Sequence, residues 1–250
     1  MDLPGTTVVK PDTETLFDKL GEALMQAALD AVEDRGVFHL ALSGGGTPEP
    51  FYVRLLTDPK FRLLPWAKTH VWIVDERCVP EDHEKANIKM IRESLTDHAD
   101  VPDDQVHPMP VLADDPAGEY EKTLAQAFGI ADPPGASNHP SIDFILLGMG
   151  GDCHTASLFP ESPALGATRW IDTNDGEKVV PPPRVTMTYP LINAGGYVCV
   201  LAVGGGKTAA LQRVADQAAT GAPDTHNIPI SGIAPGNGGL VWYLDEAAAG

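Results

Sequence analysis

Four apolar segments of this 250-residue chain are each followed by a polar or glycine-rich loop and then by residues with helical periodicity. These segments are residues 37–42, 71–74, 142–147 and 197–203, and a further apolar strand is expected at 240–244. Strands that are apolar on both faces and alternate with helices form parallel sheets covered on both sides. The chain is therefore predicted to be an α/β protein with a mostly parallel sheet and helices on both faces.

The remaining segments fit one such domain. Residues 13–34 carry apolar side chains at helical spacing, and Gly36 is expected to end that helix. Proline-rich stretches at 131–140 and 181–183 are interpreted as surface loops rather than domain linkers, because strands and helices resume after each. A chain of this length can bury a sizeable core. We therefore expect a single domain over residues 1–250.

The charge balance restricts the kinds of partner. The chain has 17 Lys and Arg against 35 Asp and Glu, which gives a formal net charge of −18. Such a surface repels nucleic acid and anionic membranes, so neither is expected as a partner. An anionic small molecule would need a local cluster of cations and backbone N–H groups.

The cysteines and the N-terminal segment bear on the compartment. Cys78, Cys153 and Cys199 are odd in number and widely spaced, so neither a disulfide framework nor a structural zinc site is suggested. The first residues contain no apolar signal-peptide core, and no stretch has the apolar length of a membrane span. We expect an unexported protein of the reducing cytoplasm.

Ligands of parallel α/β sheets bind at the carboxyl ends of the strands, so the four loops should converge on one crevice. The first loop consists of Ser43, Gly44, Gly45, Gly46 and Thr47. Its backbone N–H groups, its two hydroxyls and the dipole of the following helix suit a phosphate. A tight turn that needs positive φ angles is the alternative, and the loop alone leaves both open.

The second and fourth loops carry further cations. Asp75, Glu76 and Arg77 end the second strand, where Arg77 could bind a phosphate or an oxyanion; an ion-paired rim is the alternative. The fourth loop contains GGGKT but has Leu201 where a nucleotide-binding P-loop requires glycine. Lys207 therefore remains a phosphate-binding candidate, with a solvated lysine at a helix start as the alternative.

The third loop, GMGGDCHTASLFP, follows the strand at 142–147. Cys153 replaces the last glycine of a GxGxxG pattern, so a dinucleotide-binding fingerprint is incomplete. His154, beside Asp152, is a candidate general base, and an exposed loop histidine is the alternative. Cys153 as a nucleophile paired with His154 is disfavoured, because adjacent side chains on an extended chain point apart.

Taken together, LALSGGGTP, VWIVDERCVPEDHEKANIKMIRE, DFILLGMGGDCHTASLFP, RVTMTYPLIN, VGGGK and LVWYLDEAAA resemble the 6-phosphogluconolactonase family. The order and separation of these blocks carry the resemblance, which covers most of the chain. It implies the fold of the superfamily that holds glucosamine-6-phosphate deaminase and ribose-5-phosphate isomerase. It also implies hydrolysis of a phosphosugar lactone in the oxidative pentose phosphate pathway, without a metal or a cofactor.

The resemblance assigns roles to matching positions. The substrate-binding loop is Ser43 to Thr47, the DER block is Asp75 to Arg77, and the basic positions are Arg184 and Lys207. Within the DER block, Glu76 is expected to contact the substrate. His154 matches the family histidine. Three positions depart from the family pattern: Gly46 and Ala86 stand where serine is usual, and Cys153 replaces a glycine.

The expected substrate is 6-phospho-D-glucono-1,5-lactone. Its phosphate would lie on the Ser43–Thr47 backbone with Arg77, Lys207 and Arg184, while His154 takes a proton from the attacking water. Either Asp152 or Asp75 would orient the imidazole, and Arg77 or backbone N–H groups would stabilise the oxyanion.

We expect a monomer or a weak homo-oligomer. Two alternatives to the lactonase function remain open. The first is a glucosamine-6-phosphate deaminase, whose histidine block usually continues into IAFNEP where this chain has TASLFP. The second is a sugar-phosphate sensor without turnover, although such regulators normally carry a DNA-binding module.

Overall fold

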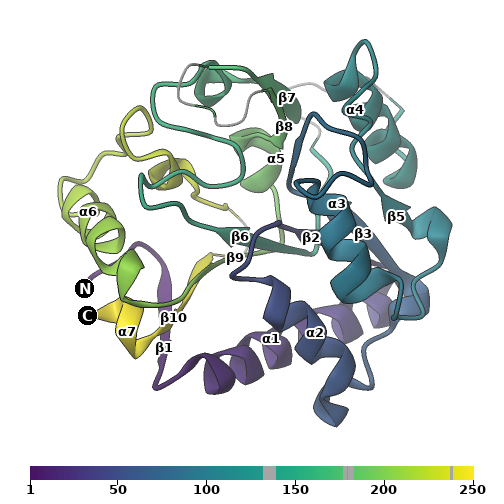
Figure 1. Cartoon of the computed structure of the whole chain (residues 1–250), viewed down its shortest axis with the longest axis horizontal. Helices are drawn as coiled ribbons and strands as arrows, with labels where there is room; N and C mark the ends of the chain where they lie inside the picture. The colour runs from purple at the N-terminus through teal and green to yellow at the C-terminus, as the bar shows by residue number, and fades with distance from the viewer. Residues whose placement is uncertain (132–138, 177–178, 180–182, 237–238) are drawn as a thin grey trace.

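The computed structural model describes residues 1–131, 139–176, 179, 183–236 and 239–250 (Figure 1). Most of the proline-rich stretch at 131–140 lies outside these ranges, as do residues 181 and 182 of the second stretch. The surface-loop interpretation of those residues therefore stays a prediction.

The main sheet has seven strands in the order β1-β10-β9-β6-β2-β3-β5, and all of its pairings are parallel. The strands are β1 (Thr6–Lys10), β2 (Phe38–Leu42), β3 (Thr69–Ile73), β5 (Val106–His107), β6 (Phe144–Gly148), β9 (Tyr197–Ala202) and β10 (Leu240–Asp245). The predicted parallel sheet is confirmed. Its two edge strands, β1 and β5, were not predicted, because β1 is largely exposed and polar and β5 is only two residues long.

Helices lie on both sides of this sheet. In Figure 1, α1 and α2 lie below the central strands and α5 lies above them. The helices are α1 (Thr13–Arg35), α2 (Glu49–Thr57), α3 (Asn87–Ile91), which continues as a π-helix over Arg92–Thr96, α4 (Pro116–Ala127), α5 (Tyr189–Ile192), α6 (Thr208–Ala218) and α7 (Glu246–Ala249). As predicted, Gly36 ends α1: it has a φ of 77° and donates its N–H to the Val32 carbonyl.

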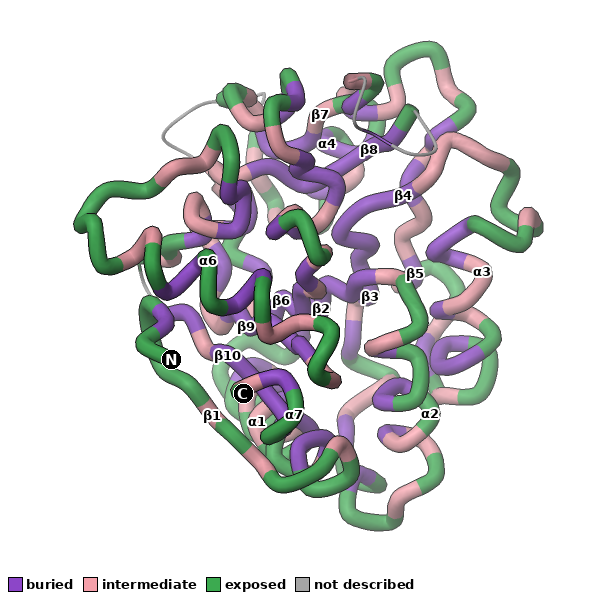
Figure 2. The backbone as a smooth tube through the Cα atoms, turned by 60° about the vertical axis from the view of Figure 1, so that its left-hand side comes forward, coloured by how far each residue is buried: buried purple, intermediate pink, exposed green. Residues whose placement is uncertain are grey.

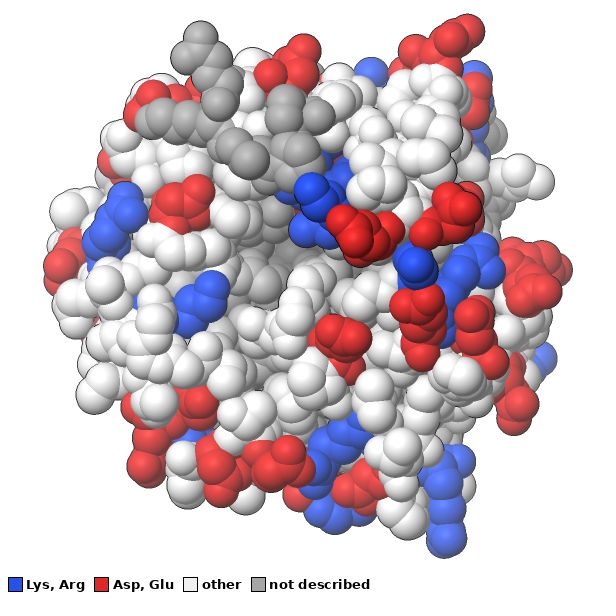
Figure 3. All heavy atoms as spheres, viewed as in Figure 1, with Lys and Arg blue, Asp and Glu red and all other residues white. Residues whose placement is uncertain are grey.

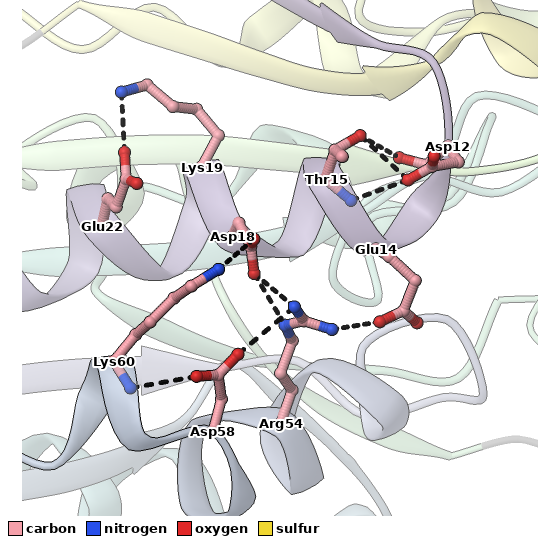
Figure 4. A network of polar contacts seen from close by, with 9 residues as sticks. All are labelled: Asp12, Glu14, Thr15, Asp18, Lys19, Glu22, Arg54, Asp58 and Lys60. Carbon is pink, nitrogen blue, oxygen red and sulfur yellow. Dashed lines mark hydrogen bonds and ion pairs between the residues drawn. The ribbon is translucent and has the colours of Figure 1, made fainter.

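Polar contacts fix the two helices below the sheet to each other (Figure 4). The Asp12 carboxylate accepts the Thr15 N–H at 2.7 Å and caps α1. Arg54 of α2 donates through Nε to Asp18 of α1 at 2.9 Å and also contacts Glu14. This network holds α2, and with it the loop that precedes α2, in a defined position against α1.

A second, antiparallel sheet was not predicted. It has the order β4-β8-β7, with β4 at Asp75–Arg77, β8 at Arg184–Met187 and β7 at Ile171–Asn174. These strands are short, and β4 follows β3 after a single residue, so no separate apolar run marks them. Their register places Arg77 directly opposite Arg184.

The core lies between the main sheet and its covering helices. All five residues of β2 are buried, and Figure 2 shows buried backbone along the central strands and mostly exposed backbone at β1. The largest fully buried side chains include Trp72, Trp170 and Trp242. Within the described ranges, no helix is long and apolar enough to cross a membrane.

Candidate active site

A cavity of about 360 Å³ opens at the carboxyl ends of the parallel strands. All four predicted loops contribute to its wall, which confirms that they converge. The lining includes Ser43 to Thr47, Asp75, Arg77, Asn87, Gly148 to Gly150, His154, Phe159, Arg184 and Lys207. Figure 3 shows Lys and Arg atoms beside a hollow near the centre of one face, on a surface otherwise rich in acidic atoms. The local cations that an anionic ligand requires are therefore present.

The first loop is both a tight turn with a positive φ angle and part of the cavity wall, so it fits both interpretations given for it. Gly45 has a φ of 105°, which a side chain rarely adopts, and the loop also lines the cavity. A Cβ at Gly44 would lie 1.9 Å from Oδ1 of Asn87, whereas one at Gly46 would meet no atom within 4 Å. The serine usual at position 46 in the family would thus fit. Ser43 Oγ is buried and has no hydrogen-bond partner among the described residues, so it is available to a ligand.

His154 faces this cavity and is oriented by Asp152. The distance from its Nδ1 to Asp152 Oδ1 is 2.6 Å. An ionised Asp152 places the proton on Nδ1, which leaves Nε2 as the basic nitrogen. Burial raises the pKa of Asp152, but hydrogen bonds from His154 and the imidazole charge outweigh it, so the pKa lies below its usual value. Gly150 allows this pairing, because a Cβ there would lie 2.2 Å from Nδ1.

Cys153, which the sequence disfavours as a nucleophile, does not line the cavity. Its φ of 69° is in the left-handed region, its side chain is fully buried, and Sγ lies 3.6 Å from the Ala210 carbonyl. Burial also raises the pKa of the thiol. The left-handed turn directs the thiol into the core and leaves the imidazole of His154 at the cavity.

Asp75 interacts with groups other than His154. Its Oδ2 accepts a hydrogen bond from Ser157 Oγ at 2.6 Å and lies 3.8 Å from Nη1 of Arg184. Of the two carboxylates predicted to orient the imidazole, Asp152 is therefore the one in contact with it. Asp75 instead holds the charge of Arg184 at the cavity wall.

Arg77 and Glu76 follow each other in β4 but point to different places. Arg77 lines the cavity, and its Nη1 donates to the Lys85 carbonyl at 2.7 Å. Glu76 is buried outside the lining and accepts three backbone N–H bonds, two of them from the first residues of α3. Burial raises its pKa. The prediction that Glu76 contacts the substrate is thus corrected: its carboxylate caps α3.

Lys207 lies just before α6, and its Nζ donates to the Met149 carbonyl at 2.6 Å across the cavity. It is therefore directed to the cavity rather than to bulk solvent. Arg77, Arg184 and Lys207 come from three separate segments and share one cavity. Two arginines directly opposite each other across a strand pair repel, and a bound anion would relieve that repulsion.

Asn87 and Phe159, whose side chains both line the cavity, were not singled out from the sequence. Asn87 donates through Nδ2 to the Asp75 carbonyl at 2.6 Å, while its buried Oδ1 has no partner among the described residues. Phe159 stacks on the His154 ring, with the centroids 4.3 Å apart. The only sequence signal for them is that Asn87 lies in the segment VWIVDERCVPEDHEKANIKMIRE and Phe159 in DFILLGMGGDCHTASLFP, both of which carry the family resemblance. Within the described ranges, no group of three or more His, Cys, Asp or Glu side chains is arranged to hold a metal ion.

A cavity at the carboxyl ends of a parallel sheet that combines three cations, a glycine loop and a His–Asp pair is typical of the class of proteins that bind small phosphorylated molecules. Residues 11–242 match the model of the family described as glucosamine-6-phosphate isomerases/6-phosphogluconolactonase, and the chain belongs to that family.

Known proteins with similar sequences or structures support the family membership of this chain. The 6-phosphogluconolactonase of Nostoc sp. is 38% identical, and the match covers 97% of this chain and 96% of the relative. The structure of 6-phosphogluconolactonase from Trypanosoma cruzi has a TM-score of 0.80 at 25% identity, covering 100% of this chain and 97% of the other. A monomeric glucosamine-6-phosphate deaminase has a TM-score of 0.77 at 18% identity over 98% of both chains, and shares the fold.

Proposed function

We propose that this chain hydrolyses 6-phospho-D-glucono-1,5-lactone to 6-phospho-D-gluconate, the lactone-opening step of the oxidative pentose phosphate pathway. The observation that carries the proposal is the His154–Asp152 pair, 2.6 Å apart, at a cavity that also holds three cations. Family membership and full-length 6-phosphogluconolactonase relatives support the choice of substrate.

The proposed mechanism uses only side chains and backbone of this chain. Arg77, Arg184 and Lys207 bind the phosphate together with N–H groups of the Ser43–Thr47 loop. Nε2 of His154 takes a proton from water as the water oxygen bonds to the lactone carbonyl carbon. Backbone N–H groups or Arg77 stabilise the oxyanion. When it collapses, the bond from the carbonyl carbon to the ring oxygen breaks, and His154 returns the proton to that oxygen.

The proposal also covers the domain organisation, oligomeric state, compartment and cofactor requirement of the protein. It comprises one domain over residues 1–250, acting as a monomer or weak homo-oligomer in the cytoplasm without a metal or cofactor. Its support is a hydrophobic core that joins the main sheet to its helices, and three cysteines that are all free thiols. A reducing compartment suits such thiols.

The direct test measures lactone loss after glucose 6-phosphate is oxidised in situ, against the spontaneous rate. The wild-type protein is expected to accelerate the loss, and His154→Ala is expected to lower kcat by about 10²-fold or more with little change in KM. His98→Ala, outside the cavity lining, is the control and should resemble wild type.

Other outcomes would reject parts of the proposal. No acceleration over the background would remove the lactonase function, and unchanged turnover in His154→Ala would remove the base assignment. Release of ammonia from glucosamine 6-phosphate would favour a deaminase. Binding of a phosphosugar without turnover would favour a sensor.

A further inference from the structure

Phe159 lies at the cavity wall and contacts two groups of the site that come from different segments, the loop after β6 and the strand β8. Its side chain is 8% exposed and lines the cavity. The loop that carries it is closed on both sides by backbone hydrogen bonds, from the Leu158 N–H to the Thr155 carbonyl and from the Ser162 N–H to the Phe159 carbonyl. The protein itself therefore holds this ring in place, before any ligand binds.

The first contact of the ring is with the imidazole of His154. The two rings are stacked, with centroids 4.3 Å apart and an interplanar angle of 28°. Asp152 holds the edge of the imidazole at Nδ1, whereas Phe159 covers its face. An edge contact alone leaves the imidazole free to tilt about the hydrogen bond, and a ring against its face restricts that tilt.

The second contact is with Arg184 of β8. The central guanidinium carbon of Arg184 lies 5.9 Å from the centroid of the Phe159 ring, within the range of a cation–π interaction. Arg184 is buried and also lies near Asp75. One aromatic ring thus contacts both the candidate base and a candidate phosphate-binding cation.

We propose that Phe159 is a positioning residue that fixes His154 and Arg184 relative to each other, an inference that rests on the proposed function. A phosphate held by Arg184 then presents the lactone carbonyl at a set distance from Nε2 of His154. Phe159 itself takes no part in proton transfer. Such geometry matters because small misplacements of a reacting group cost large factors in rate.

The test compares Phe159→Leu with Phe159→Tyr, which keeps the ring. In the lactone assay, Phe159→Leu is expected to lower kcat about tenfold through the base and to raise KM about threefold through Arg184. Phe159→Tyr should restore both parameters to near the wild-type values. The buried Phe61, outside the cavity lining, gives the control Phe61→Leu, which should lower Tm and leave kcat and KM unchanged.

A measurement independent of activity separates this inference from the proposed function. In NMR spectra, the upfield ring-current shift of the His154 imidazole protons should be present in wild type and Phe159→Tyr and lost in Phe159→Leu. Wild-type kinetics and an unchanged imidazole signal in Phe159→Leu would overturn the positioning role. So would an equal kinetic loss in Phe159→Tyr. A wild-type protein without lactonase activity would reject the proposed function, while the spectra would still report whether the Phe159 ring stacks on His154.

Discussion

At Gly150 the site has no room for a side chain. A Cβ there would lie 2.2 Å from Nδ1 of His154 and 2.5 Å from Oδ1 of Asp152. A Cβ at Gly148 or Gly151 would meet no atom within 4 Å, whereas Gly150 makes room for the His154–Asp152 pair. At Cys153, in the same loop, a side chain is present although the backbone is left-handed. That φ costs a residue with a side chain about 1 kcal/mol, and burial of the sulfur offsets this cost.

We predict that Gly150→Ala lowers kcat by about 10²-fold, because the new methyl group displaces the imidazole from Asp152. Gly151→Ala is the matched control, since a Cβ at that position meets no atom within 4 Å. Steady-state kinetics of both variants in the lactone assay, with Tm measured alongside, would check this. Equal activity of the two alanine variants would contradict the steric role of Gly150.

Three histidines, one from each of the neighbouring strands β2, β3 and β5, lie close together. His39 accepts a hydrogen bond from Trp72 Nε1 at 3.1 Å, and His70 Nδ1 lies 2.9 Å from His107 Nε2. Burial lowers the pKa of His39 to about 3 and that of His107 to about 4, with each also repelled by His70. Arg35 opposes protonation of His39 further, whereas Asp104 favours protonation of His107. These strands therefore pack around neutral imidazoles.

This arrangement predicts acid sensitivity. An unfolded histidine titrates near pH 6.5 while His39 stays neutral in the fold to about pH 3, so protons favour the unfolded state between these values. The contribution of His39 is present above pH 6.5 and is lost as the pH falls, by about 1.4 kcal/mol per pH unit. Urea unfolding at pH 7 and pH 5 should show a smaller difference for His39→Gln than for wild type. The exposed His226→Gln should retain the wild-type difference, and an unchanged difference in His39→Gln would refute the assignment.

A buried carboxylate on α4 is one of the contacts that join the two sheets of the molecule, beside the backbone hydrogen bond from the Met187 N–H to the Val74 carbonyl. Glu121 of α4 accepts hydrogen bonds from the N–H groups of Trp170 and Ile171 at 2.9 and 3.0 Å, and from Arg169 Nη2 at 2.7 Å. Ile171 begins β7, whose sheet carries Arg77 and Arg184 to the cavity. Glu121 therefore ties the cation-bearing sheet to a helix at the main sheet.

Removing that carboxylate should weaken the whole fold. Glu121→Ala leaves buried N–H groups and a cation without their partner, and we predict a loss of about 2–4 kcal/mol in the free energy of unfolding. Glu119→Ala, at an exposed position on the same helix, should change it by less than about 0.5 kcal/mol. Urea unfolding of the two variants provides the comparison. Similar stabilities would show that the contacts of Glu121 do not join the sheets.

The apolar strand pattern alone established the parallel sheet, and with it the meeting of the four loops that brings His154 and Lys207 to one cavity. Strand direction suffices for this, because all carboxyl ends of a parallel sheet lie on one edge. The tertiary structure was needed for the choice of Asp152 over Asp75, the inward turn of Glu76, and the pairing of Arg77 with Arg184. Those features depend on side-chain directions and on contacts between residues far apart in the chain. Local sequence patterns determine neither the side-chain directions nor the contacts between distant residues.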